Sequence, residues 1–292
     1  MRYPHLYELV HFRPWIILPS YHAAISDVLD RRLQGFPAED SVSHQRPKLA
    51  ADTLAGASEF APATVDADGI ATIQVNGIIA KGASAFEKSC YGGVSPEDIS
   101  RSLAAAVGNP EVHGIVLQVD SPGGTVGGVP EAAEHIASVQ ASGMPVFAFA
   151  DGLMASAAYW LSAGASRIYS TRLADVGSIG VYVPWMDRTV QFAKSGVSVD
   201  VIKDGKYKAA GFPGTRLGED DRARIQADVN RIGTDFREHV SKYRSRVPRS
   251  AMEGQAFLGV DAAEQGLVDG LVSGLSEVKA KLRLTLPTTA RT

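Results

Sequence analysis

The sequence predicts an α/β domain built on a mostly parallel sheet that helices cover. Short runs rich in Val, Ile and Ala alternate with amphipathic segments of about a dozen residues, and glycine-rich turns join them. The chain, 292 residues long, can also bury a large core. This alternation is typical of βαβ units, in which a helix links two parallel strands.

Hydrophobic periodicity places the individual elements. The expected strands are 70–79, 114–120, 145–150, 167–171, 178–183 and 197–202. The expected helices are 97–108, 129–140, one that begins near Ser156, and one from about 219 to 243. In the last helix, apolar residues recur at helical spacing on one stripe: Ile225, Val229, Ile232, Phe236 and Val240.

Composition divides the chain into four parts. Residues 1–35 are expected to form a small helical arm, with a helix that starts at Pro19 and Ser20. Residues 36–69 are rich in Ala, Pro, Ser and acidic side chains without periodicity, which is typical of a linker. The main domain is expected over 70–273, and 274–292 is expected to be a frayed C-terminal tail.

Charge and cysteine content exclude several classes of protein. Lys and Arg number 29 against 32 Asp and Glu, for a net charge of -3, so the basic surplus of a nucleic-acid-binding protein is absent. Cys90 is the only cysteine and the histidines lack metal-ligand spacing, so we expect no disulfide, metal or cofactor. Without a secretion signal or a long apolar run, the protein is expected to be soluble and cytoplasmic.

The turn VDSPGGTVGG, residues 119–128, follows a buried strand and precedes a helix. Its glycines can expose backbone N–H groups at the carboxyl end of the sheet, which is a geometry for binding anions. The phosphate-binding patterns GxxxxGK[ST] and GxGxxG are absent, so an oxyanion hole fits the turn better than a nucleotide site.

Ser156 lies at a second strand-to-helix junction, in the stretch ADGLMASAAYWLSAGA. The small residues Ala157 and Ala158 leave room for a substrate carbonyl, which favours Ser156 as a nucleophile. For an isolated serine, the alternative is a buried hydroxyl that caps a helix carbonyl.

A serine nucleophile needs a base, and the sequence offers two kinds. His113, His135 and His239 are available, but none stands in a motif that would orient it. In VIKDGKYKAAG, residues 201–211, Lys208 runs into small apolar residues. A lysine acting near neutral pH must shift its pKa by about 3 units, which costs roughly 4 kcal/mol of desolvation. A solvated basic hairpin is the alternative for this segment.

Four motifs in order resemble the signal peptide peptidase A (protease IV) family of serine-lysine peptidases: GIVLQVDSPGGTVGG, MASAAYW, VGSIGVYV and GKYKAAG. The resemblance covers about residues 70–273 and implies a ClpP/crotonase-like spiral of ββα units. It also implies that Ser156 attacks, that Lys208 is the general base and that Ser178 hydrogen-bonds this lysine. The implied oxyanion donors are Gly124 and the amide of Ala157.

Three features are similar to the phage and prophage branch of this family: the N-terminal arm, the expected absence of a membrane anchor, and Ala157-Ala158 where membrane members often have two glycines. The resemblance implies a prohead protease that cleaves scaffold, portal or capsid chains inside the assembling shell in the host cytoplasm. It further implies a homo-oligomeric ring. From the charge balance and the lack of a long apolar run, we expect no nucleic-acid or membrane partner. Family preference for small or apolar residues makes Gly123, Met154 and Tyr159 candidate pocket residues.

Three other functions stay open from the sequence. A crotonase-like acyl-CoA enzyme shares the spiral and the oxyanion site, but it does not require Ser156, Ser178 and Lys208 together. A catalytically silent assembly protein does not require them either. A cytoplasmic peptidase that degrades peptides would use the same residues on other substrates.

Overall fold

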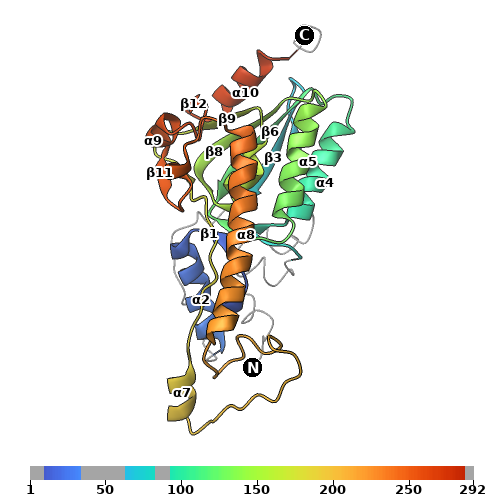
Figure 1. The fold of residues 1–292 in the computed structure, drawn as a ribbon. Coiled ribbons are helices and arrows are strands. Elements are labelled where there is room, and N and C mark those ends of the chain that lie inside the picture. Colours follow the sequence, from blue (N-terminus) through green and yellow to red (C-terminus); the bar gives the residue numbers. More distant parts are fainter. Residues whose placement is uncertain (1–9, 34–62, 83–92, 287–292) are drawn as a thin grey trace.

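The computed structural model describes residues 10–33, 63–82 and 93–286 (Figure 1). Most of the predicted linker, residues 36–69, lies outside these residues, as does Cys90. The helices are α2 (Pro19–Leu33), α4 (Pro96–Val107), α5 (Val129–Ala141), α6 (Ala157–Ala163), α7 (Thr189–Lys194), α8 (Glu219–Tyr243), α9 (Gly259–Glu264) and α10 (Leu275–Arg283), with a 3-10 turn at Arg249–Ala251.

An eight-stranded sheet forms the centre of the molecule. Its main path runs β11-β10-β8-β6-β3-β2, with β9 paired to β8 and β12 paired to β9. The strands are β2 (Thr64–Val65), β3 (Ile70–Asn76), β6 (Gly114–Ser121), β8 (Val146–Ala155), β9 (Arg167–Ser170), β10 (Asp175–Gly177), β11 (Ala256–Leu258) and β12 (Gly270–Leu271). Only the edge strands β2 and β11 pair antiparallel, so the predicted α/β class with a mostly parallel sheet is confirmed.

A second, four-stranded sheet lies at the carboxyl end of the first. Its order is β1-β7-β4-β5, from Trp15–Ile17, Gly123–Thr125, Ile78–Ile79 and Gly93–Val94. The sequence predicts one strand over 70–79, but Gly77, at a φ of 72°, divides it between the two sheets. The arm strand β1 therefore joins the chain segments that leave the main sheet.

Successive side chains of the central strands point to opposite faces of the large sheet, so apolar residues form a core on both faces. In β8, Phe147 and Phe149 pack on one face with Val278 and Leu282 of α10. Alternate residues of the same strand face the larger cluster, to which α4, α5 and α6 contribute. The expectation of a frayed C-terminal tail is therefore wrong for α10, because burial of its apolar stripe holds this helix on the sheet.

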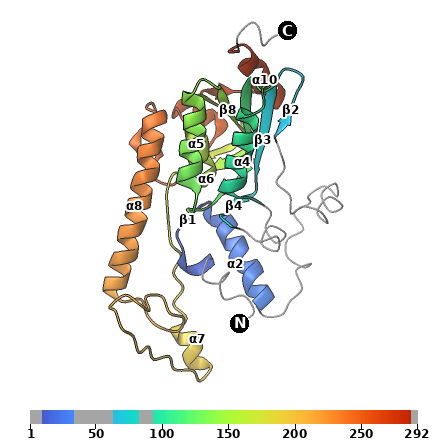
Figure 2. The same cartoon turned by 90° about the vertical axis from the view of Figure 1, so that its right-hand side faces the viewer.

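The chain between Val183 and α8 leaves the body of the molecule. We call residues 184–218 the foot segment; within it only α7 is helical, and it lies with the start of α8 at the end opposite α10 (Figures 1 and 2). The strand expected at 197–202 does not form, and Ile202 is 99% exposed. The hydrophobic pattern gave a wrong prediction here, because no neighbouring strand covers these apolar residues.

Candidate active site

Ser156 lies at the sharp junction between β8 and α6, as the sequence predicts. Its φ of 55° and ψ of -114° are unusual for a residue with a side chain. The Ser156 N–H donates to the Gly177 carbonyl of β10 at 2.7 Å, which fixes the turn. A strained strand-to-helix turn of this kind is a known way to present a nucleophilic serine at the carboxyl edge of a sheet.

The hydroxyl of Ser156 is buried and unpaired among the described residues. The residue is 1% exposed, and its Oγ makes no hydrogen bond to any of the described residues. A buried hydroxyl without a partner costs free energy, so such a group calls for a functional explanation. The alternative of a serine that caps a helix carbonyl is not what the structure shows.

The glycine-rich turn lies directly against this serine. Ser121 Oγ donates to the Gly77 carbonyl at 2.6 Å and accepts the Gly123 N–H at 3.2 Å, which ties the turn to the end of β3. Gly123 has a φ of 101°, and a Cβ added there would lie 3.0 Å from the Ser156 Cβ. Only glycine lets the turn approach Ser156 so closely.

The two predicted oxyanion donors are close to the serine. Gly124 follows Gly123 in β7, and α6 packs against β7. Ala157 is the first residue of α6, so its N–H is one of those that have no carbonyl partner within the helix. Whether these two N–H groups bind an oxyanion stays a prediction.

Ser178 is next to Ser156 across the strand pairing. It is buried, and its own φ of 52° again falls in the left-handed region. The Ser178 N–H donates to the Gln255 carbonyl at 2.8 Å, and the preceding residue, Gly177, holds the Ser156 N–H. The structure therefore brings Ser156, Ser178 and the glycine-rich turn together.

Lys208, in contrast, is exposed on the foot segment. Two residues before it, Lys206 Nζ lies 2.6 Å from Asp220 Oδ2, at the start of α8. Near Ser156 the same helix is held by Phe236, whose ring stacks on Trp160 at 4.4 Å. Asp220 and Phe236 are separated by about 24 Å along the helix axis. A single chain in this conformation does not bring Lys208 to Ser156.

Two of the predicted pocket residues are core residues instead. Met154 is buried between neighbouring strands of the main sheet. Tyr159 is also fully buried; its hydroxyl donates to the Leu267 carbonyl at 2.9 Å, and burial raises its pKa. Both side chains point into the packed interior, so neither forms a pocket wall here. Of the three, only Gly123 lies against the serine.

The three histidines that were alternative candidates for the base do not pair with Ser156. His239 Nδ1 lies 3.2 Å from Glu134 Oε1, on the side where α8 meets α5, and burial lowers the pKa of this imidazole. His135 is half-buried on α5 and His113 lies against Gly69, at the opposite end of the strands from Ser156. None of the three makes a hydrogen bond to the serine within the described residues.

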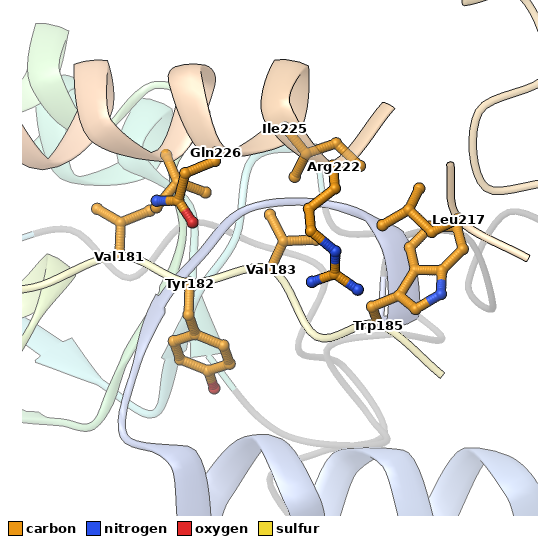
Figure 3. A pocket seen from close by; sticks show the side chains of 9 residues that line it. Val181, Tyr182, Val183, Trp185, Leu217, Arg222, Ile225 and Gln226 are labelled. Atoms are coloured by element: carbon orange, nitrogen blue, oxygen red, sulfur yellow. The ribbon is translucent and has the colours of Figure 1, made fainter. Parts of the chain in front are cut away.

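A cavity of about 240 Å³ lies between residues 181–185 and the first half of α8 (Figure 3). The sequence does not predict this cavity. Val181 and Val183 point toward α8, whereas Tyr182 points the other way, toward α2. This alternation shows that residues 181–183 are extended, although only Tyr182 pairs with another strand, at Trp15.

Two features are absent from the part of the chain that the structure describes. No group of His, Cys, Asp and Glu side chains in residues 10–33, 63–82 and 93–286 is arranged to hold a metal ion. None of the helices in these ranges combines the length and apolar character that crossing a bilayer requires.

Comparison with known families adds to this geometry. The model of peptidase family S49 matches residues 138–285, which include Ser156, Ser178 and Lys208. The chain belongs to peptidase family S49. The resemblance to the signal peptide peptidase A family is thereby confirmed.

Curated relatives of this S49 chain include phage proteins. It is 29% identical to capsid assembly protease C of Escherichia phage lambda over 94% of this chain and 64% of the relative. It is 26% identical to head-tail preconnector protein GP5 of Enterobacteria phage P21, over 92% and 55%. A putative signal peptide peptidase SppA of Enterococcus faecium is 28% identical, over 74% and 64%. The chain thus spans about half to two thirds of the length of these relatives.

Among solved structures, the 1510-N membrane-bound stomatin-specific protease matches 76% of this S49 chain and 88% of its own, at 13% identity and a TM-score of 0.40. With a score this low, the assignment of an α/β fold rests on the strand pairing described above.

Proposed function

We propose that this chain is a serine endopeptidase in which Ser156 is the nucleophile and Lys208 the general base, and that it acts on scaffold, portal or capsid chains of a phage head. The observation that carries the proposal is the strained, buried and unpartnered hydroxyl of Ser156 against the glycine-rich turn. Membership of peptidase family S49 supports the reaction class.

In the proposed reaction, Ser156 Oγ attacks the scissile carbonyl carbon while the neutral Lys208 amine takes the hydroxyl proton. The negative charge that develops on the carbonyl oxygen is held by the N–H groups of Gly124 and Ala157. The C–N bond then breaks, and Lys208 returns the proton to the leaving amine. A water molecule, activated by the same lysine, hydrolyses the acyl-enzyme and regenerates the serine.

The distance between Lys208 and Ser156 makes a second copy of the chain part of this proposal. The foot segment exposes six large apolar side chains: Met186, Val190, Val197, Ile202, Tyr207 and Phe212. Exposed apolar residues gathered on one segment are typical of an interaction surface. Burial of the foot segment against a neighbouring copy would cover them and also desolvate Lys208, which favours the neutral amine that a base requires.

The names of two relatives support the choice of substrate. One is a capsid assembly protease and the other a head-tail preconnector protein, both from phages, and each aligns with more than nine tenths of this chain. We propose that this chain shares their setting. Co-expression with neighbouring capsid genes, followed by mass spectrometry of the products, would identify the cleaved bonds.

The central experiment is casein cleavage by the purified chain and three variants. Ser156→Ala should lower kcat/KM by at least about a thousandfold, because the nucleophile is lost. Lys208→Ala should lower it by about 100-fold to 10,000-fold, the usual contribution of a general base. The matched control Lys194→Ala removes another exposed foot-segment lysine and should leave kcat/KM unchanged.

Cleavage by Ser156→Ala and Lys208→Ala at the wild-type rate would contradict the peptidase proposal. Turnover of an acyl-CoA thioester by Ser156→Ala would instead favour the crotonase-like alternative, which needs no serine nucleophile.

A further inference from the structure

Strand β1 of the N-terminal arm, described over residues 10–33, lies directly beside Ser156. It pairs antiparallel with β7, with Ile16 opposite Gly124 and Ile17 opposite Gly123. A Cβ added to Gly123 would overlap the Ile16 carbonyl oxygen and touch the Ser156 Cβ. The Ile16 carbonyl oxygen of β1 and the Ser156 Cβ therefore both lie within 3.0 Å of one point beside Gly123, where there is no room for a methyl group.

The other edge of β1 is held by the chain that follows Ser178. The Trp15 N–H donates to the Tyr182 carbonyl at 2.8 Å, and the Tyr182 N–H donates to the Trp15 carbonyl at 3.1 Å. Beyond the strand, the Leu18 N–H donates to the Pro122 carbonyl at 3.0 Å. Main-chain pairing of an added strand is also how many proteins bind extended peptides, because these hydrogen bonds do not depend on the peptide's sequence.

The arm is a separate unit laid on the domain. Ile16 joins the main core, whereas the other buried apolar side chains of the arm belong to a smaller cluster, in which Trp15, Ile17 and Leu29 meet Ile78 and Ala80 of the domain. In the chain, β1 precedes β3 by more than fifty residues, and it is no part of the eight-stranded sheet. The central sheet is therefore complete without the arm.

With β1 in place, Ser156 is closed to a substrate, because its hydroxyl has almost no accessible surface. We propose that the arm is a built-in inhibitor: β1 holds the strand position beside Ser156 that a peptide substrate must take, and the arm has to undock before a substrate binds. This inference rests on the proposed peptidase function and adds a way in which the chain regulates that activity.

The side chains of β1 also indicate which class of peptide substrate could take its place. Ile16 is part of the main core, whereas Trp15 and Ile17 belong to the arm cluster, so alternate side chains of β1 meet apolar surface on both faces. A peptide that replaces β1 would meet the domain side of the same surface. The position therefore fits an extended segment of consecutive apolar residues.

The test weakens the docking of the arm without touching the site. Leu29→Ala removes a buried leucine from the arm cluster, and the matched control Leu103→Ala removes one from α4 in the main core. We expect Leu29→Ala to cleave casein, and to label at Ser156 with a fluorophosphonate, at least tenfold faster than the wild type. Leu103→Ala should show no such gain, since it leaves β1 docked.

A synthetic peptide of residues 13–20 supplies the second arm of the test. It should inhibit Leu29→Ala competitively, because it can refill the empty position, and the same peptide with Ile16→Asp should inhibit at least tenfold less well. Hydrogen exchange of residues 10–33 reports in parallel whether the arm has undocked.

Three outcomes are distinguishable. Faster cleavage and labelling by Leu29→Ala, reversed by the peptide, supports the inhibitor. Equal rates for an active wild type and an undocked Leu29→Ala overturn the inhibitor and leave the peptidase standing. Neither cleavage nor labelling by Leu29→Ala, with hydrogen exchange showing an undocked arm, overturns both.

Discussion

At the scale of single residues, backbone strain gathers at the candidate site. Ser156 and Ser178 are the two residues other than glycine with a positive φ in the part of the chain that the structure describes, and they flank the same strand pair. Each such conformation costs on the order of 1 to 3 kcal/mol and persists only where the surroundings impose it. Because both strained serines lie beside the glycine-rich turn, single residues already indicate a functional site here.

Gly123→Ala tests how closely the turn must approach the serine. The new Cβ would meet the Ile16 and Ala155 carbonyls and the Ser156 Cβ, in addition to the cost of a φ of 101°. We expect a casein-cleavage rate at least about 100-fold lower, because misplacement of the reacting groups by about 1 Å is enough for such a loss.

The matched control is Gly254→Ala, which carries a similar φ of 96° but opens onto empty space. It should lower thermal stability by a comparable backbone cost and leave cleavage within about threefold of wild type. Equal activity of the two variants, both folded by circular dichroism, would contradict the close approach at Gly123.

At the scale of elements, the arm carries two buried histidines. Burial lowers the pKa of His11 to about 4 and also lowers the pKa of His22, whose Nε2 lies 2.7 Å from the Val10 carbonyl. The titratable and charged groups that face His11 are Asp30, which raises its pKa, and Arg188 and His22, which lower it. Because the docked arm disfavours protonation of both rings, docking is strongest above pH 6.5 and weakens as the pH falls from about 6.5 toward 4.

Hydrogen exchange of residues 10–33 at pH 7.5 and pH 5, corrected for intrinsic rates, measures this dependence. Protection of the arm should fall at pH 5 while that of α5 does not. His11→Phe should remove part of the difference, since a phenyl ring cannot be protonated, and His135→Gln on α5 should not change it. Equal protection of the wild-type arm at both pH values would show that His11 and His22 do not control docking.

At the scale of the whole molecule, the foot segment and the first half of α8 extend beyond the core (Figure 2). The buried residues of α8 all lie in its second half, between Gly233 and Val240. A long helix packed over only half its length, with an exposed apolar foot segment beside it, fits an assembly in which another copy covers this end.

Mixing two inactive variants tests this assembly. Ser156→Ala keeps Lys208, and Lys208→Ala keeps Ser156, so an oligomer of both holds some sites with one intact residue from each chain. We expect casein cleavage to return to about a quarter of the wild-type rate in an equal mixture refolded together, whereas either variant alone should show at most about 1% of that rate. No recovery in a mixed oligomer, verified by differently tagged chains, would place both residues of a working site in one chain.

The sequence alone determined the α/β class, the helix over 219–243, the serine at a strand-to-helix junction and the family. It could do so because hydrophobic periodicity, glycine positions and motif order are local properties of the chain. Only the tertiary structure decided that Met154 and Tyr159 are core residues, that α10 packs on the sheet, that Lys208 lies far from Ser156 and that β1 lies against this serine. These depend on contacts between distant segments, which local patterns do not encode.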